Sequence, residues 1–155
     1  MRMIVVYADV TAPLYWWAEC DTYKVGTVRN SCSKMHKLLS KQFEMSDFSF
    51  EHLETIARFD EDNEPHQPYM LFKDIIECLN ACRNTYLETK SKTDWWQIIQ
   101  LLPSSYNQRA TLMLNYEVLA NMYHSRKNHK LNEWHTFCDW IETLPHSELI
   151  TGDTQ

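Results

Sequence analysis

The sequence predicts an α+β protein that is predominantly helical and carries a small β-sheet. Three observations indicate this class. The N-terminal segment is rich in β-branched and aromatic residues, most later segments place apolar residues at helical spacing, and 44% of the 155 residues are hydrophobic, which is enough for one core. We therefore expect one helix-rich domain over residues 1–150 and a flexible C-terminal tail over residues 151–155.

The first half of the chain predicts one strand and two short helices. Residues 1–10 favour a mostly buried strand, and residues 13–23 favour a helix because a proline suits the first helical turn. Residues 26–33 are small and polar and predict an exposed loop. Residues 52–59 follow cap residues and put apolar side chains on one face, which predicts a second helix.

The second half reads as a series of helices. Residues 60–68 hold four carboxylates and two prolines, which is typical of a solvated connection. Residues 110–114 are compatible with a short strand or with the entry to a helix. Amphipathic stripes, with a cap at Thr93 and prolines as stop signals, predict helices over residues 69–88, 94–102, 115–125 and 131–144.

Composition excludes several classes of protein. Only two glycines occur, so the glycine-rich phosphate loops of Rossmann and P-loop folds are absent. The formal net charge of −6 opposes non-specific binding to nucleic acid. No apolar run is long enough for a membrane span or a signal peptide, and the five cysteines suit reduced thiols, so we expect a cytoplasmic protein.

Metal binding is the weaker interpretation of the cysteine and histidine pattern. Cys78 and Cys82 are four residues apart and share a helix face, yet no suitably spaced partner accompanies them, so core packing explains them better. His124, His129 and His135 lie in one region, but helical phase separates them. We therefore predict no metal site.

Two other motifs have both a structural and a functional interpretation. Ser31 and Ser33 lack a neighbouring base or a nucleophile-elbow motif, so we predict no catalytic residue there. Two tandem tryptophan pairs fit core packing, with stacking on a base or flavin as the alternative; they are Trp16, Trp17, Trp95 and Trp96.

A polar cluster near the C-terminus is the best candidate for a binding site. Arginine forks match phosphates, and amide side chains can hydrogen-bond a base edge, so the cluster suits an anionic ligand. The alternative is that its basic residues only offset a helix dipole. The cluster comprises Tyr106, Asn107, Gln108, Arg109, Asn115, Tyr116, His124, Arg126, Lys127, Asn128, His129 and Lys130.

Two stretches resemble the flavin-dependent thymidylate synthases. The first runs from Val6 to Pro13 and on through Asp21-Thr22-Tyr23-Lys24 to Asn30-Ser31-Cys32-Ser33-Lys34-Met35-His36, and is similar to that family's strand, helix and signature loop. The second contains Leu101-Leu102-Pro103, Asn115-Tyr116-Glu117-Val118-Leu119, Arg126 and Leu131-Asn132-Glu133-Trp134. The resemblance implies a fold like that of thymidylate-synthase-complementing proteins.

The sequence departs from the family's pattern where arginines hold the flavin and nucleotide phosphates. Tyr23, Lys24 and Val25 stand where the family has Arg-His-Arg, and of the later Ser-x-Arg-Tyr only Ser33 matches. The chain begins at the strand before the signature, so we expect a shortened relative rather than a full synthase.

The resemblance leads to one favoured hypothesis and two alternatives. We expect a non-catalytic nucleotide-binding protein, encoded by a phage or mobile element, that sequesters a nucleotide signal of host defence. The alternatives are a flavin-dependent thymidylate synthase-like enzyme acting on dUMP, with FAD as the possible cofactor, and a protein–protein interaction module. A homo-oligomer, dimer or tetramer, is expected. The candidate ligand-binding residues are Lys24, Arg29, Asn30, Ser31, Ser33, Tyr106, Asn107, Arg109, Asn115, Arg126 and Lys130.

Overall fold

The chain folds into two compact units in the computed structural model, which describes residues 1–31 and 38–152. The first unit comprises Met1–Cys32 and Gln108–Gln155, and the second comprises Ser33–Asn107. Each unit has its own hydrophobic core. The single domain and the tail expected from the sequence stay predictions, and residues 153–155 of that tail lie outside the described residues.

The first unit is built on a three-stranded sheet with the strand order β1–β5–β2. The strands are β1 (Val5–Pro13), β2 (Thr27–Ser31) and β5 (Asn107–Asn115). β2 pairs with β5 in antiparallel register, with Arg29 opposite Leu112. Burial alternates along β5, so that Leu112 is fully buried while Thr111 is exposed, as the period-two geometry of a strand dictates.

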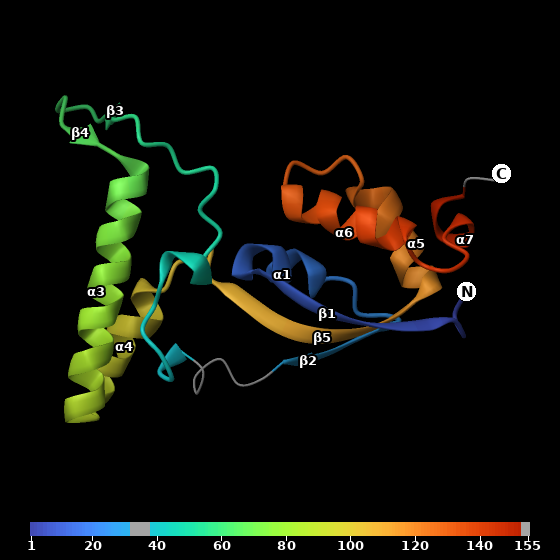
Figure 1. The fold of residues 1–155 in the computed structure, drawn as a ribbon, viewed down its shortest axis with the longest axis horizontal. Helices are drawn as coiled ribbons and strands as arrows, with labels where there is room; N and C mark the ends of the chain where they lie inside the picture. The colour runs from blue at the N-terminus through green and yellow to red at the C-terminus, as the bar shows by residue number, and fades with distance from the viewer. Residues whose placement is uncertain (32–37, 153–155) are drawn as a thin grey trace. The chain divides into compact units, whose positions relative to one another are not determined.

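Helices of the same unit lie on one face of this sheet (Figure 1). They are α1 (Leu14–Cys20), α5 (Tyr116–Arg126), α6 (Asn132–Glu142) and α7 (Glu148–Thr151). Asn115 caps α5, because its Oδ1 accepts the backbone N–H of Val118 at 2.9 Å. Trp16 and Trp134 are 1% and 0% exposed and lie 4.7 Å apart between ring centroids, at the centre of the core.

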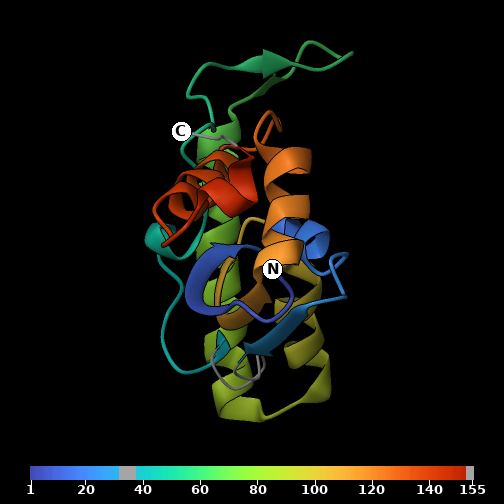
Figure 2. The ribbon, with the colours of Figure 1, turned by 90° about the vertical axis from the view of Figure 1, so that its right-hand side faces the viewer.

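The second unit is built on two helices that lie side by side in both views (Figures 1 and 2). Its elements are η1 (Met45–Asp47), β3 (Arg58–Phe59), β4 (Pro65–His66), α3 (Pro68–Thr89) and α4 (Lys92–Leu101). Leu79 of α3 and Ile98 of α4 are almost fully buried in its core. β3 and β4 form a short antiparallel hairpin beyond the N-terminal end of α3.

Three sequence predictions about local structure are wrong. The strand expected over residues 1–10 begins at Val5, and residues 5–10 are exposed or half-buried rather than mostly buried. Residues 27–31 form β2 instead of an exposed loop, because their backbone pairs with β5, which is distant in the sequence. Residues 52–59 contain no helix; Asp60 instead accepts backbone N–H groups from Asp62 and Glu64, which organises the β3–β4 hairpin.

The fold class predicted from the sequence is confirmed. The long helix expected over residues 69–88 is α3. Of the two alternatives for residues 110–114, the strand is correct, and it is part of the longer strand β5. The cap of α4 differs, because the helix begins at Lys92 and Ser91 accepts the backbone N–H of Thr93 at 3.2 Å. Among the described residues, no helix is long and apolar enough to cross a bilayer.

Candidate functional site

An arginine from α5 reaches the C-terminal end of α1. Arg126 Nη1 donates to Glu19 Oε2 at 2.8 Å, and its Nε donates to the hydroxyl of Tyr23 at 3.0 Å. The guanidinium carbon lies 5.0 Å from the ring centroid of Trp134. The side chain is 20% exposed, and its Nη2 has no partner among the described residues. Arg126 therefore keeps one donor nitrogen available to a ligand.

A second arginine approaches the same helix end from β2. Arg29 Nη1 donates to both carboxylate oxygens of Asp21, at 2.9 and 2.7 Å, and Nη2 donates to Gln108 Oε1 at 2.9 Å. Its guanidinium carbon lies 3.9 Å from the ring centroid of Trp17. These contacts hold the guanidinium group in place through both Nη atoms, while its Nε is buried and has no hydrogen-bond partner among the described residues.

Cys20 is the last residue of α1 and is buried. Burial raises the pKa of its thiol to about 12; the neighbouring Asp21 raises it further, whereas Arg29 and Arg126 oppose the shift. The thiol itself is protonated at neutral pH and has no nucleophilic role here.

Glu19 contacts several side chains at this end of α1. Besides Arg126, its Oε2 accepts the indole N–H of Trp134 at 2.9 Å. His129 Nε2 lies 3.4 Å away, while His129 Nδ1 accepts the backbone N–H of Leu131 at 3.2 Å, which places the proton of the neutral ring on Nε2. One carboxylate thus fixes three side chains from two helices and the loop between them. We call Glu19, Tyr23, Arg126, His129 and Trp134 the Arg126 cluster.

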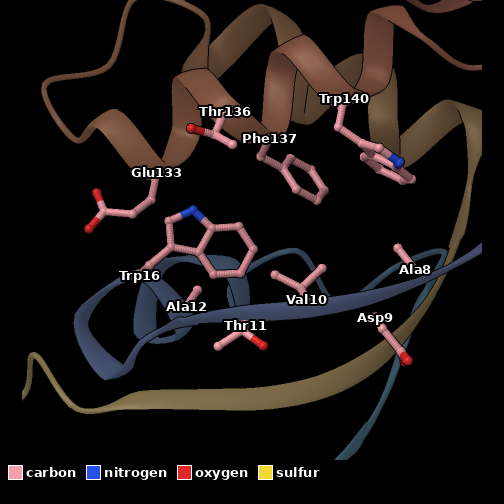
Figure 3. Close-up of a pocket in the computed structure, with 10 residues that line it drawn as sticks. All are labelled: Ala8, Asp9, Val10, Thr11, Ala12, Trp16, Glu133, Thr136, Phe137 and Trp140. Carbon is pink, nitrogen blue, oxygen red and sulfur yellow. The ribbon is translucent and has the colours of Figure 1, made fainter. Parts of the chain in front are cut away.

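A pocket of about 360 Å³ lies between β1 and α6 in the same unit (Figure 3). Figure 3 shows Phe137 and Trp140 pointing from α6 toward β1, and Trp16 closing one end. This volume falls within the range of small-molecule pockets. The lining residues are Ala8, Asp9, Val10, Thr11, Ala12, Trp16, Glu133, Thr136, Phe137 and Trp140.

The charges at the pocket do not suit a phosphate. No lysine or arginine is among its lining residues, whereas Asp9 and Glu133 are. Asp9 already accepts hydrogen bonds from Thr111 and Arg109, both at 2.6 Å, and these bonds hold the pKa of its carboxyl below the ordinary value. The pocket is therefore apolar with an acidic margin, and an anion is better accommodated at the Arg126 cluster.

The structure brings only some of the predicted ligand-binding residues together. Arg29 and Arg126 both reach the end of α1, as described above. Asn115 caps α5, and its side chain faces Gly26, so it has a structural role. Lys24 and Lys130 are exposed.

The remaining predicted residues lie elsewhere. Asn30 and Ser31 are exposed on β2, and Arg109 is exposed on β5, where it pairs with Asp9. Tyr106 and Asn107 belong to the second unit, in which Asn107 Oδ1 accepts the hydroxyl of Ser49 at 3.0 Å. Ser33, the family-matched serine, lies outside the described residues.

The sequence did not predict three residues of the Arg126 cluster as part of a ligand site. These are Glu19, Trp134 and Tyr23, which contacts Arg126. One signal was present, because Glu19 and Asp21 put two carboxylates at a helix end, where the dipole disfavours them. Such a placement indicates cationic partners from elsewhere in the chain. Which cations they are depends on tertiary contacts.

The fold is that of the flavin-dependent thymidylate synthases. No protein-family model and no curated protein matches the sequence. Among solved structures, the chain is similar to Thymidylate Synthase X (ThyX) from Helicobacter pylori with FAD and dUMP, at 14% identity and a TM-score of 0.61, over 96% of this chain and 72% of that chain.

A second crystal structure of ThyX from Helicobacter pylori, also complexed with FAD and dUMP, gives the same result. It matches at 15% identity and a TM-score of 0.62, over 97% of this chain and 73% of that one. The distant, shortened relationship expected from the sequence is thus confirmed at the level of the fold.

Proposed function

We propose that this chain is a nucleotide-binding protein whose ligand is dUMP or a closely related pyrimidine nucleotide, bound at the Arg126 cluster. The observation that carries the proposal is Nη2 of Arg126, which has no partner within residues 1–31 and 38–152, on a protein whose structural neighbours are ThyX structures holding dUMP. A guanidinium group binds phosphate oxygens through charge-assisted hydrogen bonds. Arg126 is also the family-matched arginine of the C-terminal stretch.

The surroundings of Arg126 support a monophosphate. Tyr23, which is half-buried, offers an aromatic face near the guanidinium group, and a pyrimidine ring stacks on such a face. Lys24 and Lys130 are exposed cations on the segments that follow α1 and α5. Glu19 and Asp21 offset most of the positive charge, so the proposed ligand carries one phosphate rather than several.

Flavin-dependent turnover of dUMP is the second candidate function, because both structural neighbours hold FAD beside dUMP. The fit of FAD is poorer than that of dUMP. Both Nη atoms of Arg29, the other arginine at this end of α1, already bind Asp21 and Gln108, and its Nε is buried. Among the described residues, this leaves Nη2 of Arg126 as the guanidinium nitrogen that could bind a pyrophosphate here.

Nucleotide binding without catalysis is the alternative to flavin-dependent turnover. The residues Tyr23, Lys24 and Val25 in place of the family's Arg-His-Arg favour binding without turnover. Sequestration of a nucleotide signal of host defence by a phage-encoded protein is one such role. Assembly as a homo-oligomer is part of the same proposal.

Isothermal titration with dUMP and with deoxyuridine tests the proposal. We expect dUMP to bind and deoxyuridine to bind at least tenfold more weakly, because a charge-assisted phosphate contact contributes roughly 1.5–3 kcal/mol. Arg126→Lys keeps the charge and the partner Glu19 but loses the planar fork, so dUMP affinity should fall about tenfold. Visible absorbance of the same sample reports whether a flavin is bound.

The matched control is Arg2→Lys, in which a second ion-paired arginine of the first unit is changed. Arg2 donates to Glu117 at 2.6 Å and is 80% exposed. Its replacement should leave dUMP affinity unchanged. Equal affinity for dUMP and deoxyuridine, or no effect of Arg126→Lys in a folded protein, would contradict the proposed site.

A further inference from the structure

The net charge of the chain is concentrated in one segment of the second unit. Residues 51–77 contain eight acidic and two basic side chains, which amounts to a formal charge of −6. This equals the formal net charge of the whole chain, so all other residues together are balanced. The segment forms the β3–β4 hairpin and the first turns of α3. It is a local acidic region in an otherwise neutral molecule.

The same segment exposes large apolar side chains. Ile56 and Phe59 are 68% and 64% exposed, and Met70 and Leu71 are 46% and 55% exposed. Met70 and Leu71 line a groove of about 450 Å³, together with Ala57, Pro65, His66, Gln67 and Asp74. Phe59 pairs with Pro65 across the hairpin, so the exposed residues adjoin this groove. We call Ile56, Phe59, Met70, Leu71 and the groove the hairpin patch.

The hairpin holds this patch in a defined shape. Asp60 Oδ1 accepts the backbone N–H groups of Asp62 and Glu64 at 3.0 and 2.9 Å, and Asp60 Oδ2 lies 2.9 Å from His66 Nε2. These bonds keep the pKa of Asp60 below its ordinary value, so the carboxylate is ionised at neutral pH. Asn63 takes the left-handed conformation, with φ of 64°, that the turn requires.

The chemistry of the hairpin patch restricts what can cover it. Exposed apolar surface rimmed by polar residues is typical of interaction sites. The acidic rim repels nucleic acid and anionic lipid surfaces, since both carry negative charge. A protein segment with lysine or arginine around an apolar anchor complements both features.

We propose that the hairpin patch is a docking surface for a basic protein segment that inserts an apolar side chain into the groove beside Met70 and Leu71. The basic side chains of the partner pair with the rim carboxylates, chiefly Glu61, Asp62 and Glu64. This interaction is separate from nucleotide binding, because it uses residues of the second unit only.

Fluorescence anisotropy with two labelled amphipathic peptides tests the proposal on the full chain. One peptide consists of leucine and lysine, and its counterpart of leucine and glutamate. We expect the lysine peptide alone to bind, with an affinity that falls as salt is raised. Glu61→Gln, Asp62→Asn and Glu64→Gln combined should weaken it roughly five- to tenfold. Phe59→Ser with Leu71→Ser should weaken it at least as much.

The matched control removes the same number of charges from the first unit: Glu117→Gln, Asp139→Asn and Glu148→Gln combined. This variant should bind the lysine peptide as the unchanged protein does. Equal weakening by both triple variants would mean attraction to net charge alone and would overturn the proposal. Hydrogen exchange of the unchanged protein, measured with and without the lysine peptide, needs no variant. The proposal requires that the peptide slow exchange in residues 56–74.

A second copy of this chain is the competing candidate for covering the hairpin patch. If sedimentation shows an oligomer that Phe59→Ser with Leu71→Ser dissociates, a second copy of this chain covers the hairpin patch and the proposed foreign partner is wrong. We expect the oligomeric state to be unaffected by these two changes.

Discussion

At the residue scale, Gly26 is the backbone position with the least tolerance for a side chain. It has a φ of +81°, and a Cβ built there would lie 2.6 Å from Asn115 Nδ2. Asn115 is the cap of α5, so a clash at Gly26 disturbs the helix that carries Arg126. The turn that starts β2 and the cap of α5 thus depend on each other.

Gly26→Ala should lower the free energy of unfolding by about 2–3 kcal/mol, since it combines left-handed strain with damage to a helix cap. Urea denaturation measures this. Gly152→Ala is the control: it has a φ of +78° but no atom within 4 Å of the added Cβ, so its cost is strain alone, about 1 kcal/mol. Equal losses for the two variants would show that Asn115 moves aside freely.

The cysteines should differ in reactivity according to burial. Burial raises the pKa of Cys20 to about 12 and that of Cys138 to about 11, whereas Cys78 is exposed. Because only the thiolate reacts, Cys20 and Cys138 should resist iodoacetamide at pH 8 while Cys78 is labelled, as read by mass spectrometry of peptides. Labelling of Cys20 as fast as Cys78 in folded protein would contradict the described core.

At the element scale, β5 organises the first unit as the central strand of its sheet. Leu112→Ala should cost about 2–5 kcal/mol, because its side chain is fully buried in the core. Thr111→Val, one residue away on the exposed face, removes only the hydrogen bond to Asp9 and should cost about 1 kcal/mol or less. Thermal or urea unfolding of the two variants compares the loss of unfolding free energy on the buried and exposed faces of β5. Similar losses would contradict the strand register.

Elements were predictable from the sequence where their stabilising interactions are local. Most helices were predicted correctly from stripes of apolar residues, as in α3, and from prolines that end helices. β2 was missed because a five-residue strand of polar and small side chains depends on pairing with β5. The β3–β4 hairpin was missed because residues 50–57 carry an apolar pattern that suits a helix, while Asp60 stabilises a turn.

At the scale of the whole molecule, the resemblance of two sequence stretches was enough to predict the fold, but not the contacts of the candidate site. Arg29 and Arg126 were predicted as ligand residues, yet the carboxylates that hold them, Asp21 and Glu19, were not. Arg126 and Glu19 are 107 positions apart in the sequence, and the pairing of Arg29 with Asp21, eight positions away, depends on how β2 folds back beside α1, so neither ion pair leaves a local pattern. The concentration of negative charge in residues 51–77, in contrast, is readable directly from the sequence.

The central claim is that a nucleotide binds at the Arg126 cluster, and hydrogen–deuterium exchange with and without saturating dUMP tests it most directly. We predict slower exchange in residues 19–24 and 124–130, which carry Glu19, Tyr23, Arg126 and His129. Unchanged exchange in both segments, or protection confined to residues outside the first unit, would contradict the claim.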